Sequence, residues 1–162
     1  MYIIEKFYTK VLKKEAPYYA KYSTVTIVWK PIRKYINVVI IPNVPFTNLR
    51  VKMYRMIGFK IGKNVFIGMK CYMDDIEPAK TIIGDNVTIS YGTYFACHGK
   101  SQTHTPIVID DGVYVGMRSN IISGKEGIII GKNAIIGAGS LVNRDIPENT
   151  TALGLPVKIL DK

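Results

Sequence analysis

The chain contains two histidines, His98 and His104, and both fall in one short polar stretch. Three carboxylates, Asp74, Asp75 and Glu77, lie in an earlier polar stretch. A histidine has a free pKa of about 6.5, so one that sits beside a carboxylate can act as a general base near neutral pH. Such a base can deprotonate a hydroxyl and start an acyl transfer. This chemistry requires a fold that brings the two stretches together.

A repeat of six residues runs through the chain on both sides of these stretches. An aliphatic residue followed by a short residue recurs at every sixth position, most clearly at Ile109, Val115, Ile130 and Ile136. The same frame covers four triplets of anchor residues. These anchors are Ile61, Ile67 and Met73; Ile83, Ile89 and Phe95; Ile109, Val115 and Ile121; and Ile130, Ile136 and Val142.

Two further positions keep the same phase. Four residues after the first two anchors of each triplet stands a small or β-branched residue, and three residues after them stands glycine or asparagine in six of eight cases. Small side chains let three short strands close around a narrow centre, and glycine and asparagine tolerate the positive φ of a sharp corner. The pattern therefore predicts an all-β fold, a parallel β-helix of about four coils with a filled interior.

The repeat is interrupted three times, each time after the third anchor of a triplet, by four, eight and three extra residues. In a three-sided prism such insertions must emerge along one edge, stacked coil above coil. This edge would place His98 close to the carboxylates of the preceding coil, where loops on a rigid scaffold can hold polar groups. The sequence therefore predicts His98, Asp74 and Asp75 as catalytic residues, and His104 as a surface-loop residue without a catalytic role.

The two cysteines, Cys71 and Cys97, together with the absence of a secretory signal, indicate a reducing compartment. We expect Cys71 at a small inward position. Neighbours on an extended chain point to opposite sides, so Cys97 cannot readily use His98 as its base, and direct transfer is preferred over a cysteine nucleophile. Two cysteines and two histidines so placed are too few for a zinc site, and no metal is expected.

Residues 83–89, 136–142 and 145–147 resemble the hexapeptide-repeat acyltransferases, and among them the sugar O-acetyltransferases that include galactoside and maltose acetyltransferases. The resemblance extends over residues 58–160. It implies a left-handed coil, whose sense the periodicity does not determine, and acetyl-CoA as the acyl donor. It also implies that His98 is the general base, because His98 stands where these enzymes place their catalytic histidine.

The resemblance also implies a donor site and an assembly. Matched position by position, the pantetheine arm would lie beside Gly116, Ala138 and Gly139, and the phosphates would contact Arg144 and Lys158. The family forms homotrimers in which the histidine of one subunit faces the donor site of the next. The acceptor-side asparagine of the galactoside enzymes has no clear counterpart in this chain, so the identity of the acceptor stays open.

The net charge of +10 is unevenly distributed along the chain. Residues 1–60 hold twelve Lys and Arg against two Glu, whereas residues 61–162 hold ten charges of each sign. The hydrophobic spacing predicts a basic amphipathic helix over residues 1–15 that Pro17 ends. Residues 23–29 are β-prone. We expect Thr47 to cap a second helix that Gly58 stops.

The chain is therefore predicted to consist of a basic, mainly helical segment over residues 1–57 and a hexapeptide-repeat β-helix domain over residues 58–162. The basic segment could contact an anionic membrane, hold an anionic acceptor, or only pack on the prism. Nucleic acid is not expected, because no nucleic-acid-binding motif accompanies the basic residues. The longest apolar run, residues 38–41, is too short to span a bilayer.

The sequence favours a cytoplasmic, homotrimeric O-acetyltransferase that moves acetyl from acetyl-CoA to a hydroxyl of a sugar or sugar conjugate in surface polysaccharide biosynthesis. If the basic segment binds lipid, the enzyme would lie at the inner face of the membrane. Two alternatives stay open, an N-acetyltransferase acting on an amino sugar and a non-catalytic, membrane-associated β-helical scaffold. A zinc-dependent carbonic anhydrase of similar fold would need three histidines, and this chain has two.

Overall fold

The computed structural model describes residues 3–15, 24–98 and 104–160. The chain divides into two compact units, Met1–Tyr35 and Ile36–Lys162. The first unit contains α1 (Ile3–Lys6), the π-helix η1 (Phe7–Val11) and α2 (Thr24–Tyr35). The second unit contains every strand of the described residues.

The second unit begins with short helices and continues as strands. Its helical elements are η3 (Ile36–Ile40), η4 (Ile41–Asn43), α3 (Thr47–Met56) and η5 (Pro78–Lys80). Its strands are β1 (Lys60–Ile61), β2 (Phe66–Ile67), β3 (Thr81–Ile83), β4 (Thr88–Ile89), β5 (Tyr94–Ala96), β6 (Ile107–Ile109), β7 (Tyr114–Val115), β8 (Asn120–Ile122), β9 (Ile128–Ile130), β10 (Ile135–Ile136), β11 (Leu141–Val142), β12 (Thr151–Leu153) and β13 (Lys158–Leu160).

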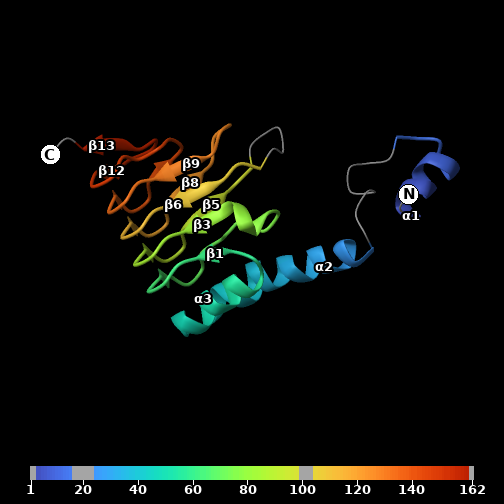
Figure 1. Ribbon diagram of the computed structural model, residues 1–162, viewed down its shortest axis with the longest axis horizontal. Helices are drawn as coiled ribbons and strands as arrows, with labels where there is room; N and C mark the ends of the chain where they lie inside the picture. Colours follow the sequence, from blue (N-terminus) through green and yellow to red (C-terminus); the bar gives the residue numbers. More distant parts are fainter. Residues whose placement is uncertain (1–2, 16–23, 99–103, 161–162) are drawn as a thin grey trace. The chain divides into compact units, whose positions relative to one another are not determined.

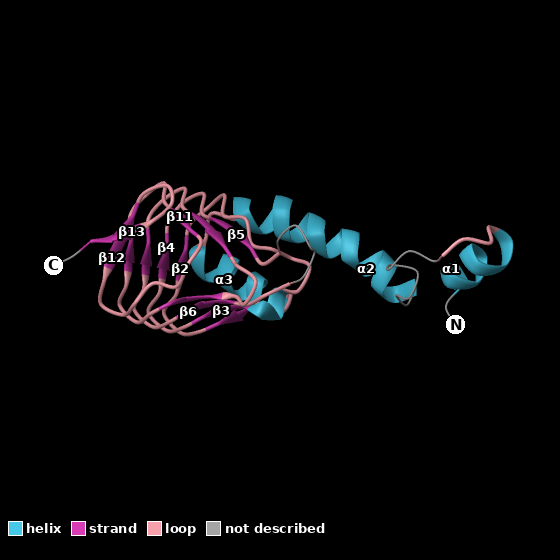
Figure 2. Ribbon diagram, turned by 90° about the horizontal axis from the view of Figure 1, so that it is seen from above, coloured by secondary structure: helices cyan, strands magenta, loops and turns pink. Residues whose placement is uncertain are grey.

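The strands form three sheets, which are the sides of a prism (Figures 1 and 2). Their orders are β1-β3-β6-β9, β13-β12-β10-β7-β4-β2 and β11-β8-β5. Pairing is parallel throughout except between β12 and β13. The register joins anchors of successive coils, as where Ile67 lies opposite Ile89 and Ile83 opposite Ile109. The predicted parallel β-helix of about four coils is confirmed.

The interior of the prism follows the predicted frame. All the anchors except Ile61 are at most 2% exposed. The second inward positions, predicted to be small, are all buried as well. They are Val65, Cys71, Val87, Thr93, Val113, Ser119, Ala134 and Ser140. The interior of the described coils is therefore lined throughout by buried side chains.

The corners of the coils also follow the frame. All eight corner residues have positive φ, including Lys70 (60°) and Arg118 (55°), where neither glycine nor asparagine is present. The other six are Asn64, Asn86, Gly92, Gly112, Asn133 and Gly139. The left-handed conformation is therefore demanded by the coil and not by the residue that occupies the corner.

Helix α3 packs against the first coil, beside β1 (Figure 1). Its Arg50 side chain is 1% exposed, and its Nε donates to the Ile67 carbonyl at 2.8 Å. Burial lowers the pKa of the Arg50 guanidinium, and its remaining hydrogen bonds go to the Ile67 and Val44 carbonyls and the Thr47 hydroxyl. The hydrogen-bond donors of this buried cation are thus paired largely with carbonyl oxygens of the first coil and of the segment before α3.

The prediction of a β-prone segment over residues 23–29 is wrong, because α2 runs from Thr24 to Tyr35 and continues through Pro31. Val28, Ile32 and Tyr35 are spaced at i, i+4 and i+7, so their apolar side chains share one helical face. Short runs of β-branched residues suit strands, but here the helical period over a longer window prevails.

Two expectations about helix ends are also corrected. The N-cap of α3 is Phe46, and Thr47 is the first helical residue rather than its cap. The first basic helix ends at Val11, and Pro17, expected to end it, lies outside the described residues. Gly58 follows the end of α3 with φ of 110°, as expected for a residue that stops a helix. Within the described ranges, no helix combines the length and the apolar character needed to cross a membrane.

Candidate active site

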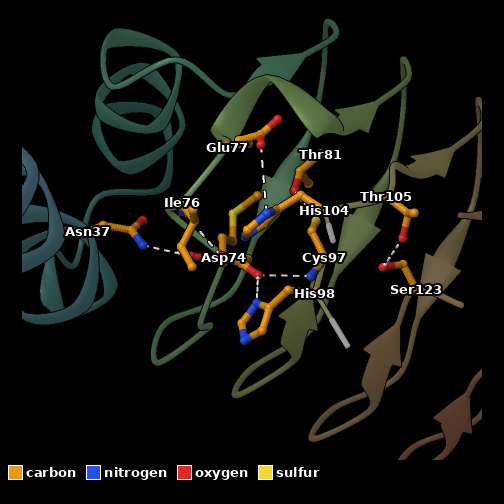
Figure 3. Close-up of polar contacts among 11 residues, drawn as sticks. Asn37, Asp74, Ile76, Glu77, Thr81, Cys97, His98, His104, Thr105 and Ser123 are labelled. Atoms are coloured by element: carbon orange, nitrogen blue, oxygen red, sulfur yellow. Dashed lines mark hydrogen bonds and ion pairs between the residues drawn. The ribbon is translucent and has the colours of Figure 1, made fainter. Parts of the chain in front are cut away.

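His98 and Asp74 form a hydrogen-bonded pair at the edge of the prism where the insertions emerge (Figure 3). His98 Nδ1 lies 2.5 Å from Asp74 Oδ2. The Asp74 side chain is fully buried, whereas the His98 side chain is 31% exposed. An ionised carboxylate can only accept, so Nδ1 carries the proton, and in the neutral imidazole the second ring nitrogen, Nε2, then holds a free electron pair. This nitrogen lies on the far side of the ring from Asp74 (Figure 3).

The pairing of successive coils places the two residues side by side. Tyr72 forms a parallel bridge with Tyr94, which puts the residues that follow each tyrosine on neighbouring coils. Asp74 Oδ2 also accepts from the Cys97 backbone N–H at 2.9 Å, and Oδ1 accepts from the N–H of Ile76 at 3.1 Å. The carboxylate is therefore held by three donors, and its orientation is set before any substrate binds.

Asn37 supports the same loop from the helical side of the second unit. This residue is fully buried, and its Nδ2 donates to the Met73 carbonyl at 2.6 Å. No periodic signal marks Asn37 in the sequence, because it precedes the first anchor of the repeat, Ile61. Only the contact between η3 and the first coil identifies it.

Residues 104 and 105 lie alongside the backbone of Cys97 and His98. His98 and His104 form an antiparallel bridge, and the Thr105 N–H donates to the Cys97 carbonyl at 2.8 Å. Thr105 Oγ1 lies 2.8 Å from Ser123 Oγ and donates to the carbonyl of the next residue, Gly124, at 2.7 Å. The backbone on which His98 sits is thereby tied to the following coil.

His104 is not the exposed surface residue that the sequence indicated, because its side chain is only 12% exposed. Its Nδ1 lies 3.7 Å from Glu77 Oε1, and the rings of His104 and His98 are 5.6 Å apart between centroids. Lys80 Nζ lies 3.1 Å from Glu77 Oε2 and donates to the His104 carbonyl. His104 therefore packs beside the site, with its own carboxylate partner.

The two cysteines are poorly suited to act as nucleophiles. Cys97 and Cys71 are each 1% exposed, and burial raises the pKa of both thiols. Cys97 Sγ lies 3.4 Å from Thr81 Oγ1, inside the prism. A thiol is a nucleophile only as its thiolate, so a raised pKa disfavours covalent catalysis at either cysteine.

Asp75 is 6% exposed and lies next to the paired carboxylate. The pKa of Tyr72 is raised well above its usual range, first by burial and then by the charges of Asp74, Tyr94 and Asp75. The rings of Tyr72 and Tyr94 are stacked at 4.4 Å and 12°. Asp74 contacts the His98 ring, and the charge of Asp75 acts on the surroundings of the pair.

The residues matched to the donor site lie elsewhere on the prism. Gly116 lies in the corner between β7 and β8. Gly139 lies in the corresponding corner of the next coil, between β10 and β11, and Ala138 precedes it. A Cβ on Gly116 would lie 2.4 Å from the Ala138 backbone nitrogen, so the coils meet closely there. Ala138 and Gly139 are exposed.

The two basic residues matched to the donor phosphates are also exposed. Arg144 follows β11 at the edge of the insertions, and Lys158 begins β13. His98 and the Gly116 corner lie on different edges of one prism. Arg144 follows the insertion edge, as His98 does, but a single chain does not bring His98 to Gly116, Ala138 and Gly139. Among the described residues, no group of three or more His, Cys, Asp or Glu side chains is placed to hold a metal ion.

Comparison with known proteins supports this reading of the fold. Residues 59–95 and 106–144 match the family model described as the hexapeptide repeat of succinyl-transferase. The galactoside O-acetyltransferase of Escherichia coli is 32% identical over 116 residues, which cover 63% of this chain and 56% of that enzyme. A Saccharomyces cerevisiae protein, YJL218W, is 39% identical over 115 residues, 57% of its length. The chain thus spans little more than half of these relatives.

Two crystal structures cover more of the chain. The hexapeptide-repeat acetyltransferase VCA0836 of Vibrio cholerae, complexed with acetyl coenzyme A, is 25% identical with a TM-score of 0.69 over 86% of this chain and 90% of its own. A maltose O-acetyltransferase of Clostridium difficile 630 is 25% identical with a TM-score of 0.65 over 100% and 97%. The expected left-handed β-helix is confirmed by these matches, and the chain belongs to the hexapeptide-repeat family of left-handed β-helical proteins.

Proposed function

We propose that the protein is an acetyltransferase that moves an acetyl group from acetyl-CoA to a hydroxyl of a sugar, with His98 as the general base. The observation that carries the proposal is the Asp74–His98 pair, a buried carboxylate that orients a partly exposed imidazole. The names of the relatives, which include galactoside and maltose O-acetyltransferases, support a sugar hydroxyl as acceptor.

The geometry of the pair suits direct transfer. His98 Nε2 accepts the proton of the acceptor hydroxyl as its oxygen attacks the thioester carbonyl carbon. The tetrahedral intermediate then collapses, the carbon–sulfur bond breaks, and the imidazolium returns the proton to the CoA sulfur. Asp74 stabilises the imidazolium and keeps Nδ1 protonated throughout. The products are the acetyl ester and free CoA.

The donor is acetyl-CoA in this proposal. The crystal structure of VCA0836 in complex with acetyl coenzyme A shows that a relative of similar fold binds it. In this chain the exposed corner at Ala138 and Gly139 would take the pantetheine arm, since no side chain projects there beyond a methyl group. Arg144 and Lys158 are exposed cations in the last coils and would contact the phosphates.

A homotrimer completes the site, because one chain leaves His98 and the corner of Gly116, Ala138 and Gly139 on different edges. Several large apolar side chains near these edges are exposed in the single chain, including Tyr94 (40%), Met117 (55%) and Ile122 (36%). A closed three-fold ring would cover such faces and bring the His98 edge of one subunit to the donor corner of the next. An acetyl-CoA-dependent reaction would run in the cytoplasm, and a sugar acceptor fits a role in surface polysaccharide biosynthesis.

Titration calorimetry with acetyl-CoA tests the donor without a choice of acceptor. We expect saturable binding with about one site per chain, and no binding at millimolar donor would contradict the proposal. A thiol-release assay with a panel of sugars and amino sugars then identifies the acceptor. Acetyl products that are cleaved by mild alkali are esters, whereas products that resist it are amides and would favour N-acetylation.

Replacing His98 with alanine tests the base. We expect turnover to fall by about 10³-fold or more, while acetyl-CoA affinity stays unchanged and the protein stays folded. Near-normal turnover in the variant would rule out His98 as the base. His104→Gln provides a matched histidine control, and its effect should be at least ten times smaller because His104 faces Glu77 rather than the exposed surface.

A further inference from the structure

The first unit carries exposed apolar side chains interleaved with lysines. In the described part of its first helical segment, Phe7 (50%), Val11 (64%) and Leu12 (43%) are exposed. Exposed lysines stand directly beside them, namely Lys6, Lys10, Lys13 and Lys14. Phe7 and Val11 are four residues apart, as are Lys6 and Lys10, so an apolar row runs alongside a basic row.

Helix α2 repeats this arrangement on a larger scale. Val28 (57%), Ile32 (46%) and Tyr35 (60%) lie at i, i+4 and i+7, which places them on one face of the helix. Trp29 (48%) borders this stripe, and Lys34 is exposed on the same helix. A soluble helix normally buries its apolar face, so a stripe exposed in this way requires a partner surface.

The charge of the unit decides the kind of partner. Residues 1–35 hold eight Lys and Arg against two Glu, a net charge of +6. Two copies of such a surface would repel each other. An anionic lipid surface is complementary in both respects, because lipid headgroups attract lysines while the boundary with the acyl chains accepts apolar and aromatic side chains.

We propose that residues 3–15 and 24–35 are a docking surface for an anionic phospholipid membrane, on which they lie in the plane of the interface. The apolar rows enter the boundary between headgroups and acyl chains, and the lysines remain at headgroup level. The surface holds the enzyme at the membrane without spanning it. This inference is independent of the transferase activity, because it rests on the first unit alone.

Trp29 makes the proposal directly testable, because it is the only tryptophan of the chain. Its emission reports on the α2 stripe without a label. Full-length protein is titrated with vesicles of phosphatidylcholine containing about one third phosphatidylserine, and with pure phosphatidylcholine vesicles, at low and high salt. We expect a blue shift and vesicle co-sedimentation with the anionic vesicles only. Binding should weaken strongly in high salt, because salt screens the lysine–headgroup attraction.

Matched charge variants separate this surface from general basicity. In the first, Lys6, Lys10, Lys13 and Lys14 are changed to Gln. In the second, four exposed lysines of the β-helix unit, Lys52, Lys63, Lys125 and Lys132, are changed to Gln, which removes the same charge. At about five-fold per lysine near the surface, the first variant should lose two to three orders of magnitude in partitioning. The second should stay within about five-fold of the parent; equal losses in both would overturn the proposal.

Further measurements test how deeply Trp29 enters the membrane and whether the surface binds a different partner. Phosphatidylcholine brominated on its acyl chains, mixed with phosphatidylserine, should quench Trp29, and vesicle binding without quenching would overturn the interfacial placement. A blue shift that appears on concentrating the protein without lipid would assign the stripe to a second copy of this chain. A shift of the same size with a soluble polyanion such as polyglutamate would replace the membrane by a soluble anionic partner. Ile32→Ser, which keeps the charge, should reduce both partitioning and quenching.

Discussion

The two units of this chain use the same kinds of residues under very different constraints. In the β-helix each side chain is fixed by the coil above and the coil below, so an isoleucine such as Ile136 is fully buried. In the first unit an isoleucine such as Ile32 is 46% exposed on a helix face. Whether an isoleucine is buried or exposed therefore follows from the sequence only where the repeat stacks it on an equivalent residue of the next coil.

The candidate active site lies where that repetition stops. Asp74 and His98 follow the third anchors of the first two triplets, at the edge where residues are inserted. Each inserted segment is long enough to leave the β-sheet, yet the residues before and after it are paired with residues of neighbouring coils. The rigid frame supplies the position of the pair, and the insertion supplies its chemistry.

The largest effect should come from the buried carboxylate at this edge. Asp74→Asn keeps the size of the side chain but replaces an acceptor by an amide that no longer favours a proton on His98 Nδ1. By analogy with other histidine–carboxylate pairs, we expect turnover to fall by about 10³–10⁴-fold. Steady-state kinetics with acetyl-CoA as varied substrate measures this, and the pH dependence of turnover should change along with it.

Asp111→Asn provides the matched control for this change. Asp111 Oδ1 accepts from the Asp85 N–H at 2.7 Å at a regular corner, and an asparagine oxygen can do the same. Turnover of this variant should stay within about two-fold of the parent. Equal losses of turnover in the two variants would contradict the assignment of catalysis to the insertion edge, because Asp111 lies in a regular corner of the repeat.

The next effect compares one substitution in both units. Ile136→Ala removes a fully buried side chain between coils, and we expect a loss of about 2–5 kcal/mol in the free energy of unfolding. Ile32→Ala removes an exposed side chain from α2 and should change it by less than about 0.5 kcal/mol. Denaturant unfolding followed by far-ultraviolet circular dichroism measures both. A comparable loss from Ile32→Ala would show that α2 is packed more tightly than its exposure indicates.

The same contrast explains what could be read from the sequence. The frame predicted inward residues, corners and the edge of the site, because one geometric demand recurs in every coil and can be checked against its copies. The structure extends this rule to Lys70 and Arg118, which stand at the same corner positions and have positive φ although neither is glycine or asparagine. Where a segment occurs once, as in residues 23–29, local β propensity was the only guide, and it was misleading.

The site itself was partly readable for the same reason. His98 and the carboxylates stand at equivalent places of neighbouring coils, so their proximity followed from the frame. The choice of Asp74 over Asp75 as the partner of His98 depends on side-chain direction within a loop, which no period specifies. The contact of Asn37 with the Met73 carbonyl and the burial of His104 depend on packing between non-repeated segments.

A smaller effect should appear at high pH. Burial raises the pKa of the Cys71 thiol, so above its ordinary value near 9 the unfolded chain loses a proton that the folded chain retains. Stability from this group is full below that pH and declines as pH rises toward the folded pKa, by at most about 1.4 kcal/mol per pH unit. Thermal unfolding between pH 7 and pH 10.5 measures the slope.

Cys71→Val tests the origin of this slope. The position stacked on Cys71 in the next coil holds the β-branched Thr93, and valine fills the inward position on the preceding side of the same coil at Val65, so the substitution suits the coil. The variant should lose less stability than the parent between pH 8.5 and pH 10.5. An unchanged slope would show that other buried groups are responsible for the alkaline loss.

The smallest effect concerns backbone conformation, and it compares two positively charged residues with positive φ. Arg118 has φ of 55° at a corner of the third coil, and Lys13 has φ of 48° after the first helix. Arg118→Gly relieves the strain of the left-handed conformation but adds freedom to the unfolded chain, and a net gain of roughly 0.5–1 kcal/mol is expected. Lys13→Gly should leave the unfolding midpoint of the β-helix unchanged, because Lys13 belongs to the other unit. Differential scanning calorimetry resolves both, and a shift of the β-helix transition in Lys13→Gly would show that the two units unfold together.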